Sequence, residues 1–284
     1  MGKMTAIFES FSFSIVALIV FPSVLVGIVA SGSLQISSLM AVAAAVLIGI
    51  NVNIINNYSD WRIDIVNGKK KLLHVGVSRG GLLLVYLATL IIAGVLLYLI
   101  NSIFLWIIVA FAVLLGILYS SLTNLKDRFP LNHLAMALGY GVLPFLFGFF
   151  SGTSSARALV AYYPLVAFLF VVCFGYSMTK DYGDITGDSL YRKNTMPVLL
   201  GKSTALKVQQ ASIIAAYVLL LVFIALGLMS PWFLLSFVSL GAALAIMNYV
   251  KVNKDPVILK RANMYNRVNH LLLRSALIVA VLLI

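Results

Sequence analysis

Apolar residues dominate nine long stretches of the chain, and short polar segments separate these stretches. They fall at 8–31, 37–58, 82–100, 103–122, 131–151, 160–180, 206–228, 231–250 and 268–284. A helix needs about 20 apolar residues to cross the hydrocarbon core of a bilayer, and most of the stretches meet that length. The ninth is short as counted, and we expect its helix to begin earlier. The pattern predicts an all-α polytopic membrane protein with about nine transmembrane helices.

The connections between the stretches predict how neighbouring helices pair. The third and fourth stretches, and likewise the seventh and eighth, are so close in sequence that each pair is expected to form an antiparallel hairpin. Longer loops, at about 59–81 and 181–205, precede the two hairpins. No linker or change of composition divides the chain, so we expect residues 1–284 to form a single transmembrane domain.

The composition fits this class of protein and excludes others. The 284 residues are 62% hydrophobic and only 10% charged, which is more apolar surface than a soluble domain can bury. The single cysteine, Cys173, lies inside a predicted span, so an intrachain disulfide is excluded. The first stretch lacks a convincing small-residue cleavage site and is expected to remain as a span.

Basic residues concentrate in alternate loops, which predicts the orientation of the chain. The loops after the second, fourth, sixth and eighth stretches hold nearly all of them, whereas the opposite loops hold only Arg157. The basic residues are Arg62, Lys69, Lys70, Lys71, Arg79, Lys126, Arg128, Lys180, Arg192, Lys193, Lys202, Lys207, Lys251, Lys254, Lys260, Arg261 and Arg267. The positive-inside rule places these loops and the N-terminus in the cytoplasm. The net charge of +12 therefore reflects topology and an anionic substrate, and we expect no nucleic-acid partner.

Five of the eight acidic residues fall in two short motifs, each at the end of an apolar stretch. The members are Asn53, Asn56, Asp60 and Asp64 in the first acidic motif and Asp181, Asp184 and Asp188 in the second. Within each motif the spacing is three or four residues, which keeps the side chains on one face of a helix. Both motifs lie on the predicted cytoplasmic side, so they can face one cavity.

This pair of motifs predicts a magnesium site. Carboxylates at the end of a membrane span are costly unless a cation meets them. Carboxylate and amide oxygens suit Mg²⁺, which shares its coordination shell with substrate phosphates and stabilises a diphosphate leaving group. Basic residues beside the motifs are expected to bind the remaining phosphate oxygens. A single acidic residue at the end of a span is usually just a solvated loop residue. That alternative does not account well for two matched clusters that hold most of the acidic residues of the chain.

At these motifs the chain resembles the UbiA-type intramembrane prenyltransferases. Asn56, Asp60 and Asp64 in NNYSDWRID match the family's N-x-x-x-D-x-x-x-D motif, and KDYGDITGDSLYRKNTMPVLLG matches its second, Asp-rich motif. There are departures: Asn57 stands where many members have Asp, and Arg192 where Gly is usual. KKKLLHVGVSRGG also replaces an Arg-Pro-Leu-Pro-like segment. These differences bear on the subfamily more than on the metal site, because the spaced aspartates remain.

The resemblance implies a ring of nine transmembrane helices around a central cavity, and magnesium-dependent transfer of an isoprenyl chain from its diphosphate to an acceptor. Tyr119 and Lys126 in LYSSLTNLKDR match the loop in which a tyrosine and a lysine approach the diphosphate. The implied catalytic residues are Asp60, Asp64, Asp181 and Tyr119. The implied metal ligands are Asn56, Asp60, Asp64, Asp181, Asp184 and Asp188, and the diphosphate-binding residues are Asn53, Asn56, Arg62, Lys126, Lys180 and Lys193.

Aromatic side chains near the motifs are candidates to stabilise an allylic carbocation, because ring faces attract cations. They are Tyr58, Trp61, Tyr119, Tyr140, Phe145, Tyr176 and Tyr182, although core packing or an interfacial belt explains any one of them better than catalysis does. The histidines His74, His133 and His270 show no metal-binding spacing, and we expect no catalytic role for His74.

The acceptor is less determined than the donor. The segments ESFSFSIVALIVFPSVLVG and Tyr140–Gly152 are similar to enzymes that prenylate dihydroxynaphthoate, which favours an aromatic quinone precursor of the dihydroxynaphthoate or hydroxybenzoate type. The aspartate spacing and KDYGDITGD are similar to enzymes that prenylate a glycerol phosphate in archaeal ether-lipid synthesis. A third hypothesis, an ion-coupled transporter, also explains intramembrane acids, but transporters usually place them near the midplane on broken helices.

Overall fold

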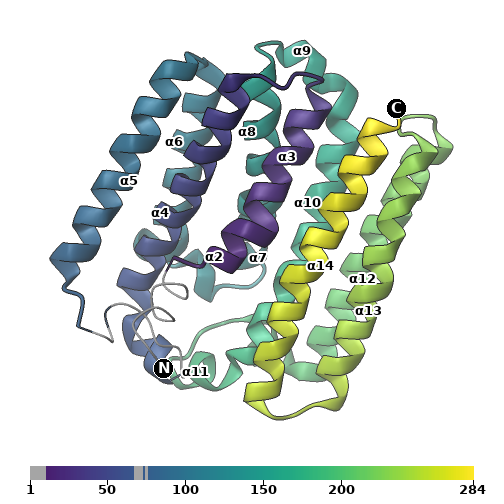
Figure 1. The fold of residues 1–284 in the computed structure, drawn as a ribbon. Coiled ribbons are helices and arrows are strands. Elements are labelled where there is room, and N and C mark those ends of the chain that lie inside the picture. The colour runs from purple at the N-terminus through teal and green to yellow at the C-terminus, as the bar shows by residue number, and fades with distance from the viewer. Residues whose placement is uncertain (1–10, 67–72, 74–75) are drawn as a thin grey trace.

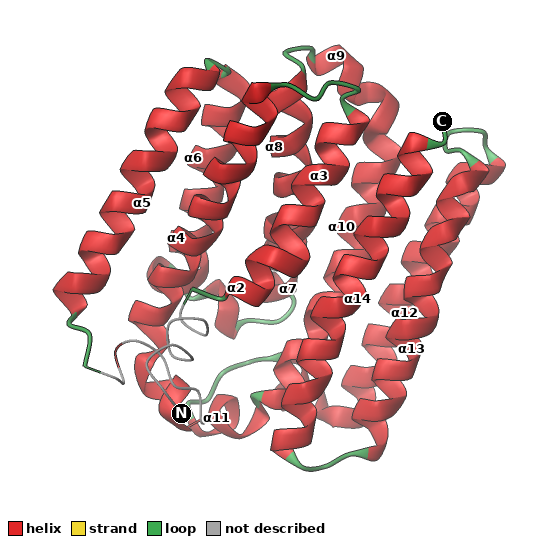
Figure 2. Ribbon diagram, viewed as in Figure 1, coloured by secondary structure: helices red, strands yellow, loops and turns green. Residues whose placement is uncertain are grey.

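The computed structural model describes residues 11–66, 73 and 76–284, and its helices run side by side along the molecule (Figure 1). Helices and loops account for all of the described residues, with no strand among them (Figure 2). The long helices are α3 (Phe21–Ala30), α4 (Ile36–Val66), α5 (Arg79–Ile100), α6 (Ile103–Ile117), α8 (Leu143–Gly152), α10 (Tyr163–Ser177), α12 (Met196–Ala225), α13 (Phe237–Val252) and α14 (Pro256–Leu282). The predicted all-α membrane fold is confirmed.

Short helical pieces extend or connect these helices. The π-helical turns are η1 (Val16–Val20), η3 (Leu118–Leu122) and η5 (Leu138–Val142), and the 3₁₀ turns are η4 (Leu125–Asp127), η6 (Val160–Tyr162), η7 (Met178–Gly183) and η8 (Pro231–Ser236). The short α-helices are α2 (Phe13–Ile15), α7 (Leu131–Ala137), α9 (Ala156–Leu159) and α11 (Ile185–Leu190). Continuous spans therefore form from several pieces, as when α7, η5 and α8 together cover the predicted fifth span.

Eight helical segments among the described residues are long and apolar enough to cross a membrane. The ninth predicted span is α14, which begins at Pro256 and so confirms that the helix starts before residue 268. The assignment of Lys260, Arg261 and Arg267 to a loop is wrong, because all three lie on this helix. Their charges interrupt the apolar pattern, so only the part of α14 from residue 268 onward stands out as an apolar stretch.

The two long loops are also shorter than predicted. Helix α4 continues to Val66, so residues 59–66 are helical and not part of a loop. The segment 181–205 contains η7, α11 and the first turns of α12. Gly201 interrupts α12 with a positive φ of 72°, a conformation that glycine adopts without a steric cost. The second acidic motif is consequently held by short helices.

The helices close into a ring. Helix α3 packs against α4, α8 and α14, and α14 in turn packs against α13. The circuit continues through α12 and α10, and from α10 to α7 and η5. Helix α5 lies outside the ring against α4, at the edge of the molecule in Figure 1, and most of its apolar side chains are exposed. This arrangement is the ring that the family resemblance implies.

Close helix packing holds the first half of this ring together. Glycines face each other where α3 meets α8: a methyl group added to Gly27 would lie 2.0 Å from the Phe145 carbonyl oxygen, and one added to Gly148 would lie 1.9 Å from the Val24 carbonyl oxygen. Only residues without a side chain allow the two backbones to approach so closely. Of the two helices, α8 forms part of the wall of the cavity described below, and α3 supports it from behind.

Candidate active site

The first acidic motif lies on the last turns of α4 and turns inward. Asn56 Oδ1 accepts a hydrogen bond from Ser120 Oγ at 3.3 Å. Asp60 is 14% exposed, and its Oδ1 lies 2.7 Å from Lys126 Nζ. Asp64, one turn further along, is buried. The predicted spacing therefore places these side chains along one inward face of α4, with Lys126 brought to them from the turn η4.

The second acidic motif lies on η7 and α11, and α11 packs against α4. Asp181 is buried, with its Oδ2 3.2 Å from His133 Nε2 and 3.4 Å from Asn132 Nδ2. Asp184 begins α11 and is half-buried, and Asp188 is buried one turn later. The three aspartates thus occupy different surroundings, and Asp181 is held most tightly by neighbouring side chains.

Lys193 connects the two motifs. Its Nζ lies 2.7 Å from Asp127 Oδ1 and 4.0 Å from both Asp60 Oδ1 and Asp188 Oδ1. One ammonium group is therefore within ion-pair distance of a carboxylate from each motif. Residues more than a hundred positions apart in the sequence meet at this point.

A short backbone pairing places Lys126 and Lys193 next to each other. Arg128 and Asn194 form an isolated parallel bridge, in which the Phe129 N–H donates to Asn194 O and the Asn194 N–H donates to Asp127 O, both at 2.8 Å. The pairing joins the segment after α6 to the segment before α12. We call these two lysines the lysine pair.

Burial and neighbouring charges act on the groups of this cluster in opposite directions. Burial raises the pKa of Asp188 to about 6, although Lys193 counteracts the shift. Burial also lowers the pKa of Lys126 against the opposing pull of Asp60. For Lys193, burial lowers the pKa as well, but Asp60, Asp127 and Asp188 together outweigh it and the net shift is upward. The charged form of Lys193 is therefore the one that the carboxylates hold in place.

Lys180 and Tyr119 form a second polar contact near the cluster. The Lys180 Nζ donates to the Tyr119 hydroxyl at 2.6 Å and also lies over the Tyr119 ring, 5.3 Å from its centre. Tyr119 belongs to the π-helical turn η3 at the end of α6, and its ring lines the cavity. The Lys180–Tyr119 contact marks the boundary between the charged cluster and the apolar interior.

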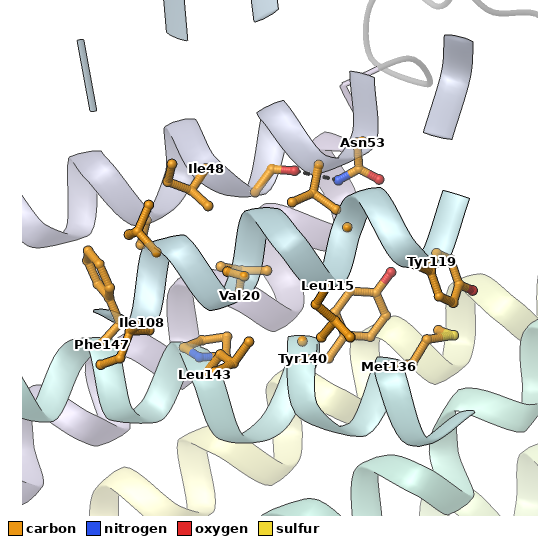
Figure 3. Close-up of a pocket in the computed structure, with 18 of the residues that line it drawn as sticks. Val20, Ile48, Asn53, Ile108, Leu115, Tyr119, Met136, Tyr140, Leu143 and Phe147 are labelled. Carbon is orange, nitrogen blue, oxygen red and sulfur yellow. Dashed lines mark hydrogen bonds between the residues drawn. The ribbon is translucent and has the colours of Figure 1, made fainter. Parts of the chain in front are cut away.

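An apolar cavity of about 130 Å³ extends from this boundary into the first half of the ring. Tyr119, Tyr140 and Met136 lie near one end, and Ile108 and Phe147 near the other (Figure 3). The wall comes from α2, η1, α4, α6, η3, α7, η5 and α8. Its shape and composition suit a hydrocarbon chain whose polar head lies at the charged cluster.

Not every predicted site residue reaches the cluster. Asn53 lines the cavity and donates from Nδ2 to Gly49 O at 2.7 Å. Arg62 is exposed and lies over the Trp61 ring, 5.2 Å from its centre, and Arg79 lies over the same ring at 5.5 Å. Lys69, Lys70, Lys71 and His74 lie outside the described residues. The structure therefore brings Lys126, Lys180 and Lys193 to the site, and places Arg62 on an outer face of α4.

The candidate aromatic side chains divide in the same way. Tyr119 and Tyr140 line the cavity, whereas Tyr58 is exposed beside Arg79. Trp61 lies under Arg62 and Arg79, and Phe145, Tyr176 and Tyr182 are buried; none of these four lines the cavity. Tyr119 and Tyr140 are thus the two candidates whose rings a bound chain would meet.

Sequence reasoning missed three residues of the site. Asp127 holds Lys193, and Asn132 and His133 hold Asp181, with His133 Nδ1 2.9 Å from Ser177 Oγ. All three follow Lys126 closely in the chain, in the segment that connects α6 to α7. Polar residues at the start of an apolar span were the signal that could have revealed them.

The donor atoms of the cluster fit magnesium. Carboxylates and an amide oxygen are hard ligands of the kind that Mg²⁺ prefers. Within the described part of the chain, no three His, Cys, Asp or Glu side chains converge as a ready-made metal site. Lys193 instead lies between Asp60 and Asp188, and Lys126 lies beside Asp60. A divalent cation would take over the role of these ammonium groups, which would then be free to face phosphate oxygens.

Comparisons with known proteins agree with this geometry. The family model described as the UbiA prenyltransferase family matches residues 20–268. No curated protein matches the chain by sequence. A solved structure of a digeranylgeranylglyceryl phosphate synthase superposes with a TM-score of 0.69 at 19% identity and covers 100% of both chains.

Two further solved structures share the fold. A UbiA homologue from Archaeoglobus fulgidus bound to GPP and Mg²⁺ has a TM-score of 0.65 at 14% identity, covering 95% of this chain and 98% of that one. A UbiA homologue from Aeropyrum pernix K1 has a TM-score of 0.63 at 21% identity, covering 96% and 98%.

The family match spans most of the chain and includes both acidic motifs. It favours an enzyme over the ion-coupled transporter considered from the sequence. The multi-pass membrane fold, the two acidic motifs and the family match lead to one conclusion: the chain belongs to the UbiA prenyltransferase family and is a membrane enzyme of that family.

Proposed function

We propose that this enzyme transfers an isoprenyl chain from its diphosphate to a hydrophobic acceptor in a magnesium-dependent reaction. The observation that carries the proposal is the position of Lys193, whose ammonium group lies 4.0 Å from a carboxylate of each acidic motif. A diphosphate bound there is within reach of both motifs at once. The cavity next to it provides the apolar space that the isoprenyl tail requires.

Each group around the diphosphate has a defined role in this proposal. Lys126, Lys180 and Lys193 bind the phosphate oxygens, because ammonium groups form strong charge-assisted hydrogen bonds. The oxygens of Asn56, Asp60, Asp64, Asp181, Asp184 and Asp188 would hold Mg²⁺, which neutralises the diphosphate and stabilises it as a leaving group. Asn132 and His133 orient the Asp181 carboxylate.

The cavity controls the fate of the isoprenyl group. Ionisation of an allylic diphosphate leaves a delocalised carbocation, and the rings of Tyr119 and Tyr140 present aromatic faces that stabilise a cation. The apolar wall excludes water, which would otherwise capture the carbocation as an alcohol. The acceptor nucleophile is therefore the favoured partner of the cation.

Two classes of acceptor are candidates. The sequence favours an aromatic quinone precursor, through the likeness of its first span and of the Tyr140–Gly152 segment to dihydroxynaphthoate prenyltransferases. The fold comparison supports a geranylgeranylated glycerol phosphate, because a digeranylgeranylglyceryl phosphate synthase covers the whole chain at a TM-score of 0.69. The aromatic acids and the glycerol phosphate carry different charges, so their prenylated products can be distinguished in one assay.

The proposal is tested with purified protein in nanodiscs. The protein is incubated with radiolabelled geranylgeranyl diphosphate, Mg²⁺ and, one at a time, dihydroxynaphthoate, hydroxybenzoate or a geranylgeranylated glycerol phosphate. We expect one class of acceptor to yield a prenylated product and excess EDTA to abolish it. Product formation that continues in EDTA would contradict the metal dependence, and the absence of product with every acceptor would contradict the proposed substrate classes.

A further inference from the structure

Arg274 is a fully buried arginine in the interior of a membrane helix. It lies on α14 with 0% of its surface exposed. Among the described residues, no carboxylate pairs with its guanidinium group, although burying a lone charge in a membrane protein is costly. The cost of burying this charge must be offset by the hydrogen bonds that the guanidinium group makes.

All three nitrogen atoms of this guanidinium are occupied. Nε donates to Ser23 Oγ at 2.8 Å, and Nη2 donates to Tyr140 O at 3.0 Å and to Cys173 Sγ at 3.1 Å. Nη1 contacts His270 Nδ1 at 2.6 Å, which requires that ring nitrogen to act as the acceptor, and it also donates to His270 O at 3.3 Å. The arginine thereby joins α3, η5, α10 and α14, and it has no donor left for a substrate anion.

The carbonyl of Tyr140 explains why donors are needed at this place. In an α-helix this oxygen would accept a hydrogen bond from the backbone nitrogen four residues later, but that residue is Pro144, which has no N–H. The chain here also forms a π-helical turn, in which the Leu143 N–H donates to Leu138 O. Arg274 Nη2 supplies a donor to the Tyr140 oxygen instead, at 3.0 Å. Ser23 Oγ lies 3.1 Å from the same oxygen, but its single hydrogen also faces Ile19 O at 2.7 Å.

The side chain of the same residue faces the cavity. The Tyr140 ring lies in the wall close to Leu115, toward the end where Tyr119 and Met136 are found (Figure 3). The backbone of Tyr140 is thus held from one side by Arg274, while its ring is presented to the other. Pro144, which removes the usual donor, lines the cavity as well.

We infer that Arg274 is a positioning residue for prenyl transfer: oriented by Ser23, which accepts from its Nε, it holds the Tyr140 carbonyl at the Pro144 break and so fixes the Tyr140 ring at the reactive end of the cavity. This inference rests on the proposed use of the cavity by the isoprenyl chain. Loss of the guanidinium would let the π-helical turn shift and would open the wall at Tyr140. A carbocation formed beside a displaced ring is less well stabilised and is more exposed to water.

The test uses Arg274→Met and Ser23→Ala, of which the second is the milder change, and Arg267→Met as a control on the same helix. The readouts are kcat and KM for the prenyl diphosphate, and the ratio of free prenyl alcohol to transferred product. We expect Arg274→Met to lower kcat/KM by roughly tenfold to a hundredfold, as displacements remote from the reacting atoms do. It should also raise the alcohol fraction, whereas the control keeps the wild-type ratio. Ser23→Ala should move both readouts in the same direction by less.

Two double variants separate positioning from a general loss of stability. Pro144→Ala restores an N–H four residues after Tyr140, so it should return the alcohol fraction of Arg274→Met toward the wild-type value. In a Tyr140→Ala background, Arg274→Met should have little further effect, because the residue through which it acts is gone. Lower thermal stability with an unchanged alcohol fraction and unchanged KM would overturn the inference and make Arg274 a purely structural link.

If the proposed prenyl transfer itself is wrong, the outcome differs from that expected when only the role of Arg274 is wrong. Binding of a non-ionisable prenyl thiolodiphosphate is measured by calorimetry for the wild type and for Arg274→Met. A wild-type protein that binds none of it contradicts the proposed function. A wild type that binds it and transfers the prenyl group, with an Arg274→Met variant that matches it in affinity and in product ratio, contradicts the positioning role alone.

Discussion

At the scale of single residues, the acidic motifs work through their neighbours as much as through their own charge. Asp60 faces the lysine pair, and Asp181 faces Asn132 and His133. Aspartates of one motif therefore differ in what they can do, although their spacing in the sequence is regular. Substitutions that remove the charge but keep the shape of the side chain are the appropriate probes.

Asp60→Asn and Asp184→Asn should each leave the protein folded and reduce turnover by at least about a hundredfold, because each removes a negative charge from a cation site and no apolar packing contact. Thermal unfolding in detergent and the transfer assay measure the two quantities. The double variant should be little worse than either single variant, since one loss already disables a shared site. Independent, multiplicative effects of the two changes would argue against a shared site.

Lys193→Ala and Arg62→Ala should differ sharply in their effect on diphosphate affinity. Lys193 lies between the motifs, so its loss should weaken binding roughly 10- to 100-fold, the range for a hydrogen bond to a charged group. Arg62 is exposed and stacked on Trp61, so its loss should change affinity by less than about threefold, as expected for an exposed charge. Calorimetry with a thiolodiphosphate measures both. Equal losses of diphosphate affinity in the two variants would mean that Arg62 also binds the diphosphate.

At the scale of the elements, breaks in the helices coincide with functional positions. The π-helical turns η3 and η5 carry Tyr119 and Tyr140, whose rings line the cavity. The second acidic motif lies on η7 and α11, two short helices that follow the sixth span. An unbroken helix would present these side chains at other angles, and the regular helices provide the frame that fixes the breaks.

Gly148→Ala tests the frame at its closest contact. The new methyl group would overlap the Val24 carbonyl oxygen, so α3 and α8 must separate, and we expect a loss of about 1–3 kcal/mol in the free energy of unfolding. Gly241→Ala is the matched control, because a methyl group there has no neighbour within 4 Å and the residue lies inside α13. Denaturation in detergent followed by circular dichroism compares the two. Equal stability of both variants would mean that the contact is looser than described.

At the scale of the whole molecule, every second connection between successive spans lies at the same end of the ring. Helix α11 lies at one end and α9 at the other (Figure 1). The basic residues of the even loops predict that the end with α11 faces the cytoplasm. The proposed site would then receive its diphosphate from that side.

Cysteine labelling in intact cells tests this orientation. Single cysteines near Gly201 and near Ser154 should react from opposite sides of the membrane, the first from the cytoplasm and the second from outside. The native Cys173 is buried and should give little background. Reaction of both positions with an impermeant reagent added from the same side would contradict the predicted topology.

The sequence predicted the helices and the two motifs better than it predicted their surroundings. Apolar length and the spacing of Asn56, Asp60 and Asp64 are local properties, so they could be recognised without a structure. The pairing of Lys193 with both motifs depends on the bridge between Arg128 and Asn194, which joins distant segments. The start of α14 was hidden by Lys260, Arg261 and Arg267, which interrupt the apolar pattern before residue 268.

The lysine pair gives the resting site part of its counter-charge, because Lys126 lies beside Asp60 and Lys193 lies between Asp60 and Asp188. A magnesium ion arriving alone must displace these ammonium groups from the motif carboxylates, which deprives Lys126 of Asp60 and leaves Lys193 with Asp127 alone. An ion that arrives with diphosphate gives them new partners, so each ligand should strengthen the binding of the other by the same factor. The site then responds to the coincidence of metal and prenyl donor, and cellular magnesium by itself leaves it in its resting state.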